Sequence, residues 1–267
     1  MRIPCWFGGS VALLAAQLAL AQPSPEGGVM IPAKDKFHVY LLLGQSNMAG
    51  GGALPATPEP ANPRILVLNP SNAWAVARDP LHFDFPGRGV GPGMSFAQTM
   101  LQHEKDPAVV IGLIPCAYSG SKLEQWQPGG ALSSNAMARA QIATGQGTLK
   151  GVLWHQGESD SDAETNAVTY GTRLAQMIRD LRAVLGAGDL PFVAAQLCPA
   201  IEGHGGYPYA KVVNQALAAL PTRVPRTACA DSQGLANKGD GLHFTAEAQV
   251  ELGQRYAAEM LKLTRSP

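Results

Sequence analysis

Residues 37–48 read FHVYLLLGQSNM, an apolar run that ends at a glycine and is followed almost at once by a serine. The run does not alternate between apolar and polar side chains. Such a run is typical of a strand in a parallel sheet that is covered on both faces. The stretch therefore predicts an α/β fold in which Ser46 follows the end of a buried strand.

Further apolar runs and helical patterns extend the same plan along the chain. Strand-like runs occupy residues 64–68, 108–114, 151–154, 191–197 and 226–230. Apolar residues at three- and four-residue spacing predict helices over 93–104, 132–145, 164–185, 208–219 and 245–263. This alternation predicts a three-layer α/β/α sandwich with a mainly parallel sheet and right-handed crossovers. Residues 50–63 and 69–92 are expected to be irregular, and neither a repeat nor a linker divides residues 36–267.

Composition excludes two classes of partner. The 267 residues are 46% hydrophobic, and 20 Lys and Arg residues balance 20 Asp and Glu residues. A nucleic-acid partner requires a cationic surface that replaces counterions, and no basic run is present. Charge-driven binding to a membrane surface is equally unsupported.

The first 21 residues have the pattern of a signal peptide. Arg2 is followed by the apolar run VALLAAQLALA at residues 11–21, which ends in a small-x-small cleavage site. A membrane anchor is the alternative, but the run is shorter than the ~20 residues that a spanning helix needs. We therefore expect cleavage after Ala21, a flexible leader over residues 22–35, and a secreted or periplasmic protein.

Cysteine usage predicts neither a disulfide framework nor a metal site. Outside the targeting segment the chain has Cys116, Cys198 and Cys229, an odd number that favours buried thiols. A bond between Cys198 and Cys229 stays open, because their strands could be neighbours. His155 and Glu158 have no second histidine at ligand spacing, so we predict no metal and no cofactor.

Two segments offer the parts of a serine hydrolase. Ser46 could be a nucleophile or a helix N-cap. Asp240 lies three residues before His243, so its carboxylate could hold the Nδ1 of the ring and leave Nε2 for a serine, or it could simply make an Asx turn. Glu158 follows another strand and is the rival acid. Because ligands of parallel sheets bind at the carboxyl ends of the strands, these groups should converge.

Aromatic and amide side chains are the candidates for binding substrate. Trp126 lies in a polar segment, and its face could cover the C–H side of a sugar ring. Gln45 and Asn47 flank Ser46 and are expected to join it in binding substrate. The Gly-x-Ser-x-Gly elbow of the α/β-hydrolases is missing around Ser46, which disfavours that fold.

Five blocks occur in order along the chain: GQSNM at 44–48, GPGMSFA at 91–97, PCA at 115–117, WHQGESD at 154–160 and DGLHF at 240–244. With these blocks the chain resembles the SGNH-type carbohydrate esterases, and most of all the sialic-acid-type acetylesterases with the acetylxylan esterases of carbohydrate esterase family 6. The resemblance covers about residues 36–263.

The resemblance implies a flavodoxin-like sandwich and a metal-free serine esterase. It implies Ser46 as nucleophile, His243 as base and Asp240 as the acid, although in some relatives the acid is the glutamate that matches Glu158. The oxyanion donors that it implies are the Ser46 N–H, the Gly93 N–H and the Gln156 side chain, each of which lies in one of these blocks.

We therefore expect a secreted serine esterase that removes O-acetyl groups from carbohydrate, on acetylxylan or sialic-acid-type substrates, through an acetyl-enzyme. Two alternatives remain from sequence. One is a lipase or thioesterase of the same fold, and the other is a non-catalytic carbohydrate-binding protein on this scaffold. Both a nucleophile and a base are present, which favours an enzyme.

Overall fold

One seven-stranded sheet organises the fold in a computed structural model, which describes residue 1 and residues 29–265. The strands are β1 (Phe37–Gly44), β2 (Ile65–Leu68), β3 (Trp74–Val76), β4 (Val110–Pro115), β5 (Thr148–His155), β6 (Phe192–Ala195) and β7 (Thr227–Ala230). Their order in the sheet is β3-β2-β4-β1-β5-β6-β7. Neighbouring strands are parallel, except that β2 and β3 are antiparallel.

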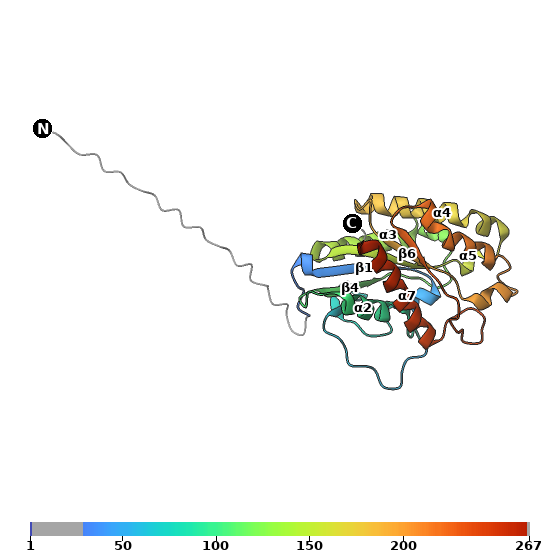
Figure 1. The fold of residues 1–267 in the computed structure, drawn as a ribbon, viewed down its shortest axis with the longest axis horizontal. Helices are drawn as coiled ribbons and strands as arrows, with labels where there is room; N and C mark the ends of the chain where they lie inside the picture. Colours follow the sequence, from blue (N-terminus) through green and yellow to red (C-terminus); the bar gives the residue numbers. More distant parts are fainter. Residues whose placement is uncertain (2–28, 266–267) are drawn as a thin grey trace.

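Helices cover both faces of the sheet and make three layers (Figure 1). One face carries α2 (Pro92–His103) and α7 (Ala246–Arg265), which pack against each other. The other face carries α3 (Ala131–Gln146), α4 (Glu164–Leu185) and α5 (Ala210–Ala218). The short elements are η1 (Lys34–Lys36), α1 (Ser46–Ala49), η2 (Leu123–Trp126), η3 (Glu158–Asp160), η4 (Pro199–Gly203) and α6 (Leu220–Arg223). The predicted α/β/α sandwich with a mainly parallel sheet is confirmed.

The central strand explains the apolar run at the start of the domain. Val39 and Leu41 belong to the core on the side of α3 and α4, whereas Tyr40 and Leu42 belong to the core on the side of α2 and α7. Each buried side chain of this size contributes about 1.5–3 kcal/mol by leaving water. Both faces of β1 are therefore apolar because both are covered.

The six predicted strands and five predicted helices all occur, and the differences lie in short elements. β3 falls inside residues 69–92, which the sequence marked as irregular. It pairs only with β2, through a tight turn in which Asn69 accepts the N–H groups of Ser71 and Ala73. Three residues at a sheet edge are too few to show a period, and α1 and α6 are missed for the same reason.

The predictions for the N-terminal segment fall only partly within the described residues. The predicted signal peptide lies outside the described residues, as does most of the predicted leader. In the described part of the leader, Val29 and Ile31 pack against the core, and the Lys34 carbonyl accepts the Thr148 hydroxyl. Packing against the core thus begins before residue 36. Across residues 29–265, the helices lack a segment with the length and apolarity needed to span a membrane.

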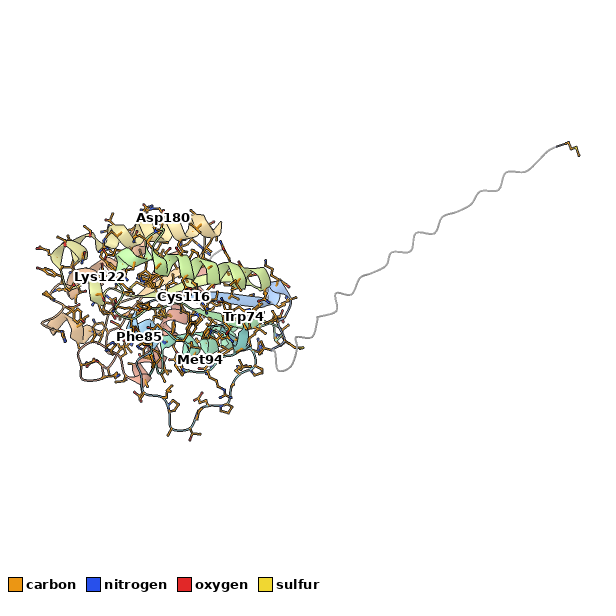
Figure 2. All side chains as sticks on the ribbon, turned by 180° about the vertical axis from the view of Figure 1, so that it is seen from behind. Trp74, Phe85, Met94, Cys116, Lys122 and Asp180 are labelled. Carbon is orange, nitrogen blue, oxygen red and sulfur yellow. The ribbon has the colours of Figure 1, made fainter. Side chains whose placement is uncertain are left out.

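The strand order places three loops side by side at the carboxyl edge of the sheet. β1 lies between β4 and β5, so the segments that follow these three strands are neighbours. The Tyr118 N–H donates to the Gly44 carbonyl (2.9 Å), and the Gln45 N–H donates to the His155 carbonyl (2.8 Å). Figure 2 shows Phe85 and Lys122 toward this end of the molecule. Crevices of this kind are where parallel sheets bind ligands.

Candidate active site

Ser46 leaves β1 through a sharp turn that requires glycine. Gly44 has a φ of 132°, and a Cβ at this position would lie 2.0 Å from the carbonyl oxygen of His155. The chain enters α1 directly afterwards, and Gln45 is the N-cap residue of this short helix. Ser46 therefore stands at a helix start between the ends of β1 and β5.

Ser46, His243 and Asp240 form one continuous chain of hydrogen bonds. The Oγ of Ser46 lies 2.9 Å from Nε2 of His243, and Nδ1 of His243 lies 2.8 Å from Oδ2 of Asp240. The hydroxyl thus contacts the imidazole, and the reading of Ser46 as a helix N-cap does not hold. With Nδ1–H donating to the carboxylate, Nε2 is free to accept the serine proton.

A tight turn aims the carboxylate and the imidazole at each other. Oδ1 of Asp240 accepts the N–H groups of Leu242 (2.9 Å) and His243 (2.8 Å), and Gly241 has a φ of 68°. Asp240 therefore makes an Asx turn and also holds the ring. Desolvation favours a higher pKa for Asp240, but the two N–H groups and the His243 ring outweigh it and lower this pKa to about 2.

The rival acid Glu158 supports the histidine segment through a neighbour. Its buried Oε1 accepts a hydrogen bond from Nδ2 of Asn47 (2.8 Å). The same Nδ2 donates to the Leu242 carbonyl (3.1 Å), and Oδ1 of Asn47 accepts the N–H of Phe244 (3.2 Å). These contacts fix the backbone on both sides of His243. Glu158 thus orients Asn47, while the contact with Nδ1 belongs to the other acid.

His155 beside Glu158 is a buried neutral ring. Its Nε2 lies 3.7 Å from Oε1 of Glu158, which is too long for a hydrogen bond. Burial lowers the pKa of His155 to about 3 and raises the pKa of Glu158, so desolvation opposes an ion pair. In the described residues, groups of three or more His, Cys, Asp or Glu side chains that could hold a metal ion are absent.

Gly93 lies in the first turn of α2, where the helix packs closely against neighbouring side chains. A Cβ at Gly93 would lie 2.9 Å from Cδ1 of Leu42, so glycine allows the helix to pack against β1. Pro92 precedes it and lacks an N–H, so Gly93 supplies the first N–H of the helix, which has no intrahelical acceptor. A Cβ at Gly91 would lie 3.1 Å from the Met48 carbonyl, which shows that the later part of α1 is close to the start of α2.

The side chain of the predicted oxyanion donor Gln156 makes its hydrogen bonds elsewhere in this arrangement, and its role stays a prediction. Its Nε2 donates to Oδ2 of Asp160 (2.7 Å) and to the Ser121 carbonyl (3.0 Å). Its Oε1 accepts the hydroxyl of Tyr170 (3.0 Å), and the side chain is fully buried. Both amide protons are therefore used, and Gln156 joins the loops after β4 and β5.

The three residues predicted to bind substrate are buried in this structure, and that role stays a prediction. Trp126 is 2% exposed, packs edge-to-face on Trp154 and donates its Nε1–H to Oγ of Ser121 (3.0 Å). Gln45 and Asn47 are also buried. The Gln45 amide faces other protein groups, and the Asn47 amide holds the histidine segment. A sugar cannot reach the face of Trp126 in this position.

Asp160 is a residue of the site that sequence reasoning missed. Its carboxylate is almost fully buried and accepts the N–H of Leu123 (2.8 Å), the amide of Gln156 and the guanidinium of Arg173 (2.7 Å). It follows Glu158 by two residues, but no spacing rule predicts that a buried acid will join several loops through hydrogen bonds.

The three thiols Cys116, Cys198 and Cys229 are free.

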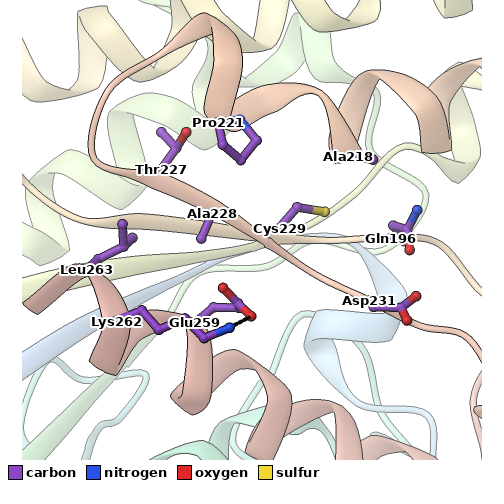
Figure 3. A pocket seen from close by; sticks show the side chains of 10 residues that line it. All are labelled: Gln196, Ala218, Pro221, Thr227, Ala228, Cys229, Asp231, Glu259, Lys262 and Leu263. Carbon is purple, nitrogen blue, oxygen red and sulfur yellow. Dashed lines mark hydrogen bonds and ion pairs between the residues drawn. The ribbon is translucent and has the colours of Figure 1, made fainter.

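A cavity of about 440 Å³ lies away from these residues, at the edge strand β7 (Figure 3). Thr227 and Cys229 of β7, Pro221 of α6 and Glu259 of α7 line it, together with the nearby Lys262. It contains none of the residues that surround Ser46.

Comparison with known proteins agrees with the geometry. Residues 36–262 match the family described as carbohydrate esterase, sialic acid-specific acetylesterase. A probable carbohydrate esterase of Arabidopsis thaliana is 35% identical over 264 residues, covering 88% of this chain and 98% of that protein.

Two solved structures are also similar. An X-ray structure of an Arabidopsis thaliana protein has a TM-score of 0.77 at 34% identity, over 84% of this chain and 98% of the other. A carbohydrate acetylesterase from Xanthomonas citri has a TM-score of 0.62 at 23% identity, over 83% of this chain and 55% of that one. The second likeness concerns the fold. The chain belongs to the carbohydrate esterase family of sialic acid-specific acetylesterases.

Proposed function

We propose that this esterase removes O-acetyl groups from carbohydrate with Ser46 as nucleophile, His243 as base and Asp240 as the acid that orients the base. The observation that carries the proposal is the pair of contacts at 2.9 and 2.8 Å that joins the three side chains. No other acid contacts the imidazole among the described residues. The family assignment supports an ester of carbohydrate as the substrate.

The mechanism follows from where the protons are held. As the Ser46 hydroxyl attacks the acetyl carbonyl, Nε2 of His243 accepts its proton, and the ionised Asp240 stabilises the resulting imidazolium. The imidazolium then protonates the sugar oxygen as its bond to the acetyl carbon breaks, so the sugar leaves as an alcohol and an acetyl-enzyme remains. Water, activated by the same nitrogen, releases acetate and restores the serine.

The oxyanion of each tetrahedral intermediate needs donors that are in place beforehand. The N–H of Ser46 lies in the first turn of α1, and that of Gly93 lies in the first turn of α2. First-turn N–H groups have no intrahelical acceptor, and they lie at the positive ends of the helices. We propose these two groups as the oxyanion donors, and each is expected to contribute about 10²–10³ in kcat.

The proposal also covers the substrate class of the enzyme and its location in or outside the cell. Acetylxylan-type and sialic-acid-type esters are the two substrate classes that we propose, and the predicted N-terminal signal peptide supports action outside the cytoplasm. Loops rather than the three catalytic residues set such specificity.

The test measures acetate release from acetylated xylo-oligosaccharides and from an O-acetylated sialoside, beside a series of aryl esters of increasing acyl length. We expect hydrolysis of at least one acetylated carbohydrate and a sharp preference for aryl acetate over longer acyl chains. Ser46→Ala should lower kcat by several orders of magnitude. Ser46→Ala with near-normal activity would refute the mechanism, and a preference for long acyl chains would indicate a lipase or thioesterase.

A further inference from the structure

Three aromatic side chains stand out on the surface of the described residues. The exposed large apolar side chains in this part of the chain include Phe83, Phe85 and Tyr118, which are 46%, 44% and 40% exposed. The rings of Phe85 and Tyr118 contact each other with centroids 5.5 Å apart and planes tilted by 50°. Single exposed apolar residues need no explanation, whereas adjoining aromatic rings beside a reaction centre point to a ligand.

The Phe85–Tyr118 pair is tied to the reaction centre on the side of β1. The backbone N–H of Tyr118 donates to the carbonyl of Gly44, which lies two residues before the nucleophile Ser46. Substitution of the Tyr118 side chain leaves this backbone bond in place. The aromatic pair therefore lies beside the exit of β1, at the carboxyl edge of the sheet.

The loop that carries Phe85 is also tied to the histidine side of the site. After residue 85 it returns as a short antiparallel bridge between Gly52 and Val90. The adjacent Gly51 lies against the imidazole, since a Cβ there would be 3.8 Å from Cδ2 of His243. The two rings thus belong to loops that contact the candidate nucleophile segment and the candidate base.

An ion pair holds the two rings together before any ligand binds. Arg88 donates to both carboxylate oxygens of Asp84 (2.8 and 3.0 Å), and Asp84 also accepts the N–H of Ser119 (3.0 Å). The Arg88 guanidinium lies over the ring of Phe85, with its carbon 5.3 Å from the centroid. The Asp84 and Arg88 side chains are mostly buried. The aromatic pair is therefore preorganised, which lowers the entropy cost of binding.

We infer that Phe85 and Tyr118 form a binding platform for the sugar ring of the substrate, and this inference rests on the proposed function. The C–H face of a pyranose is apolar and packs on aromatic rings, while its hydroxyls stay in water. The backbone of Tyr118 is bonded to Gly44, two residues before Ser46, so the platform takes the carbohydrate part of the ester while the acetyl group faces the serine. It takes the role that the sequence predicted for Trp126, which is buried in the core.

The experiment compares Phe85→Ala, Tyr118→Ala and the double variant with wild type on acetylated xylo-oligosaccharides, an O-acetylated sialoside and 4-nitrophenyl acetate. An aryl acetate has no sugar ring, so the ratio of kcat/KM for the carbohydrate to kcat/KM for the aryl acetate isolates the platform. We expect this ratio to fall about five- to tenfold for each single variant, mainly through KM, and further for the double variant. Tyr118→Phe should keep the ratio within about twofold, because the ring remains.

Phe83→Ala is the matched control. Phe83 has the same side chain, similar exposure and the same loop, but its cation partner is Arg139 of α3 (5.1 Å to the centroid), whereas the ring of Phe85 contacts Tyr118. This variant should leave the ratio unchanged. Equal falls for Phe83→Ala and Phe85→Ala, or an unchanged ratio in the double variant, would overturn the platform. If wild type hydrolysed aryl acetate but none of the acetylated carbohydrates, the platform would also be overturned, while the esterase mechanism would stand. If wild type hydrolysed none of these esters, the proposed function itself would be rejected.

Discussion

The two acids near His243 occupy opposite environments. Asp240 lies on a turn with its side chain 43% exposed, whereas Glu158 is fully buried under the site. The exposed acid contacts the imidazole, and its pKa is lowered to about 2 because N–H groups hold the carboxylate. The buried acid has a raised pKa and contacts the histidine segment only through Asn47. We therefore base the proposal of Asp240 as the orienting acid on its contact with Nδ1, and not on burial or on proximity in sequence to a strand end.

Loss of the exposed acid should have the largest effect. Asp240→Asn removes the charge that stabilises the imidazolium and permits the wrong ring tautomer, so we expect kcat/KM for aryl acetate to fall about 10³–10⁴-fold. The thermal unfolding midpoint checks that the variant remains folded. If the variant retained more than about a tenth of wild-type activity, Asp240 would not be the orienting acid.

Loss of the Asn47 amide, which contacts Glu158 and the backbone on both sides of His243, should have the second largest effect. Asn47→Ala removes the bonds that hold Leu242 and Phe244 and leaves buried polar groups without partners, at about 1–3 kcal/mol of stability for each group. We expect kcat to fall about 10–100-fold at temperatures where the variant is folded, with a smaller change in KM. Unchanged kcat in folded Asn47→Ala would show that the histidine segment holds its position without this amide.

Glu158→Gln should have a smaller effect, because a glutamine Oε1 can still accept the hydrogen bond from Asn47. We expect kcat/KM to stay within about tenfold of wild type. Glu158→Ala is the paired variant and should lose more stability in urea unfolding, since it leaves a cavity and an unpaired amide proton. A loss in Glu158→Gln as large as in Asp240→Asn would transfer the orienting role to Glu158.

The sequence predicted the long elements and the contact between Asp240 and His243 well, for a physical reason. β1 is buried on both faces, and α4 repeats its apolar stripe over many turns, so their patterns are unambiguous. Asp240 and His243 are close in sequence, and the turn that joins them is local. Such features need no knowledge of what the rest of the chain does.

Side-chain exposure in loops could not be predicted in this way. Trp126 lies among polar residues, yet it follows β4 into a segment that folds back on Trp154. Gln156 looked like a donor, but Asp160 and Ser121 use its protons. These outcomes depend on contacts between the loops after different strands, which a single sequence does not specify.

The smallest expected effect is on stability against pH. Because the folded pKa of Asp240 is lowered to about 2, its ionised form stabilises the fold above the unfolded pKa of about 3.9, and this contribution is lost as pH falls toward 2. The stability advantage of wild type over Asp240→Asn in urea unfolding should therefore shrink between pH 4 and pH 2. A constant advantage over this interval would mean that the carboxylate is not held by its N–H partners.

The most direct measurement identifies the side chain that accepts the acyl group. Treatment with an aryl organophosphonate, followed by peptide mass spectrometry, should give one adduct, on Ser46. Labelling should be far slower in His243→Ala and should vanish in Ser46→Ala, in parallel with the loss of aryl acetate hydrolysis. An adduct on another residue, or full hydrolysis by Ser46→Ala, would contradict the assignment of Ser46, His243 and Asp240 as the catalytic triad.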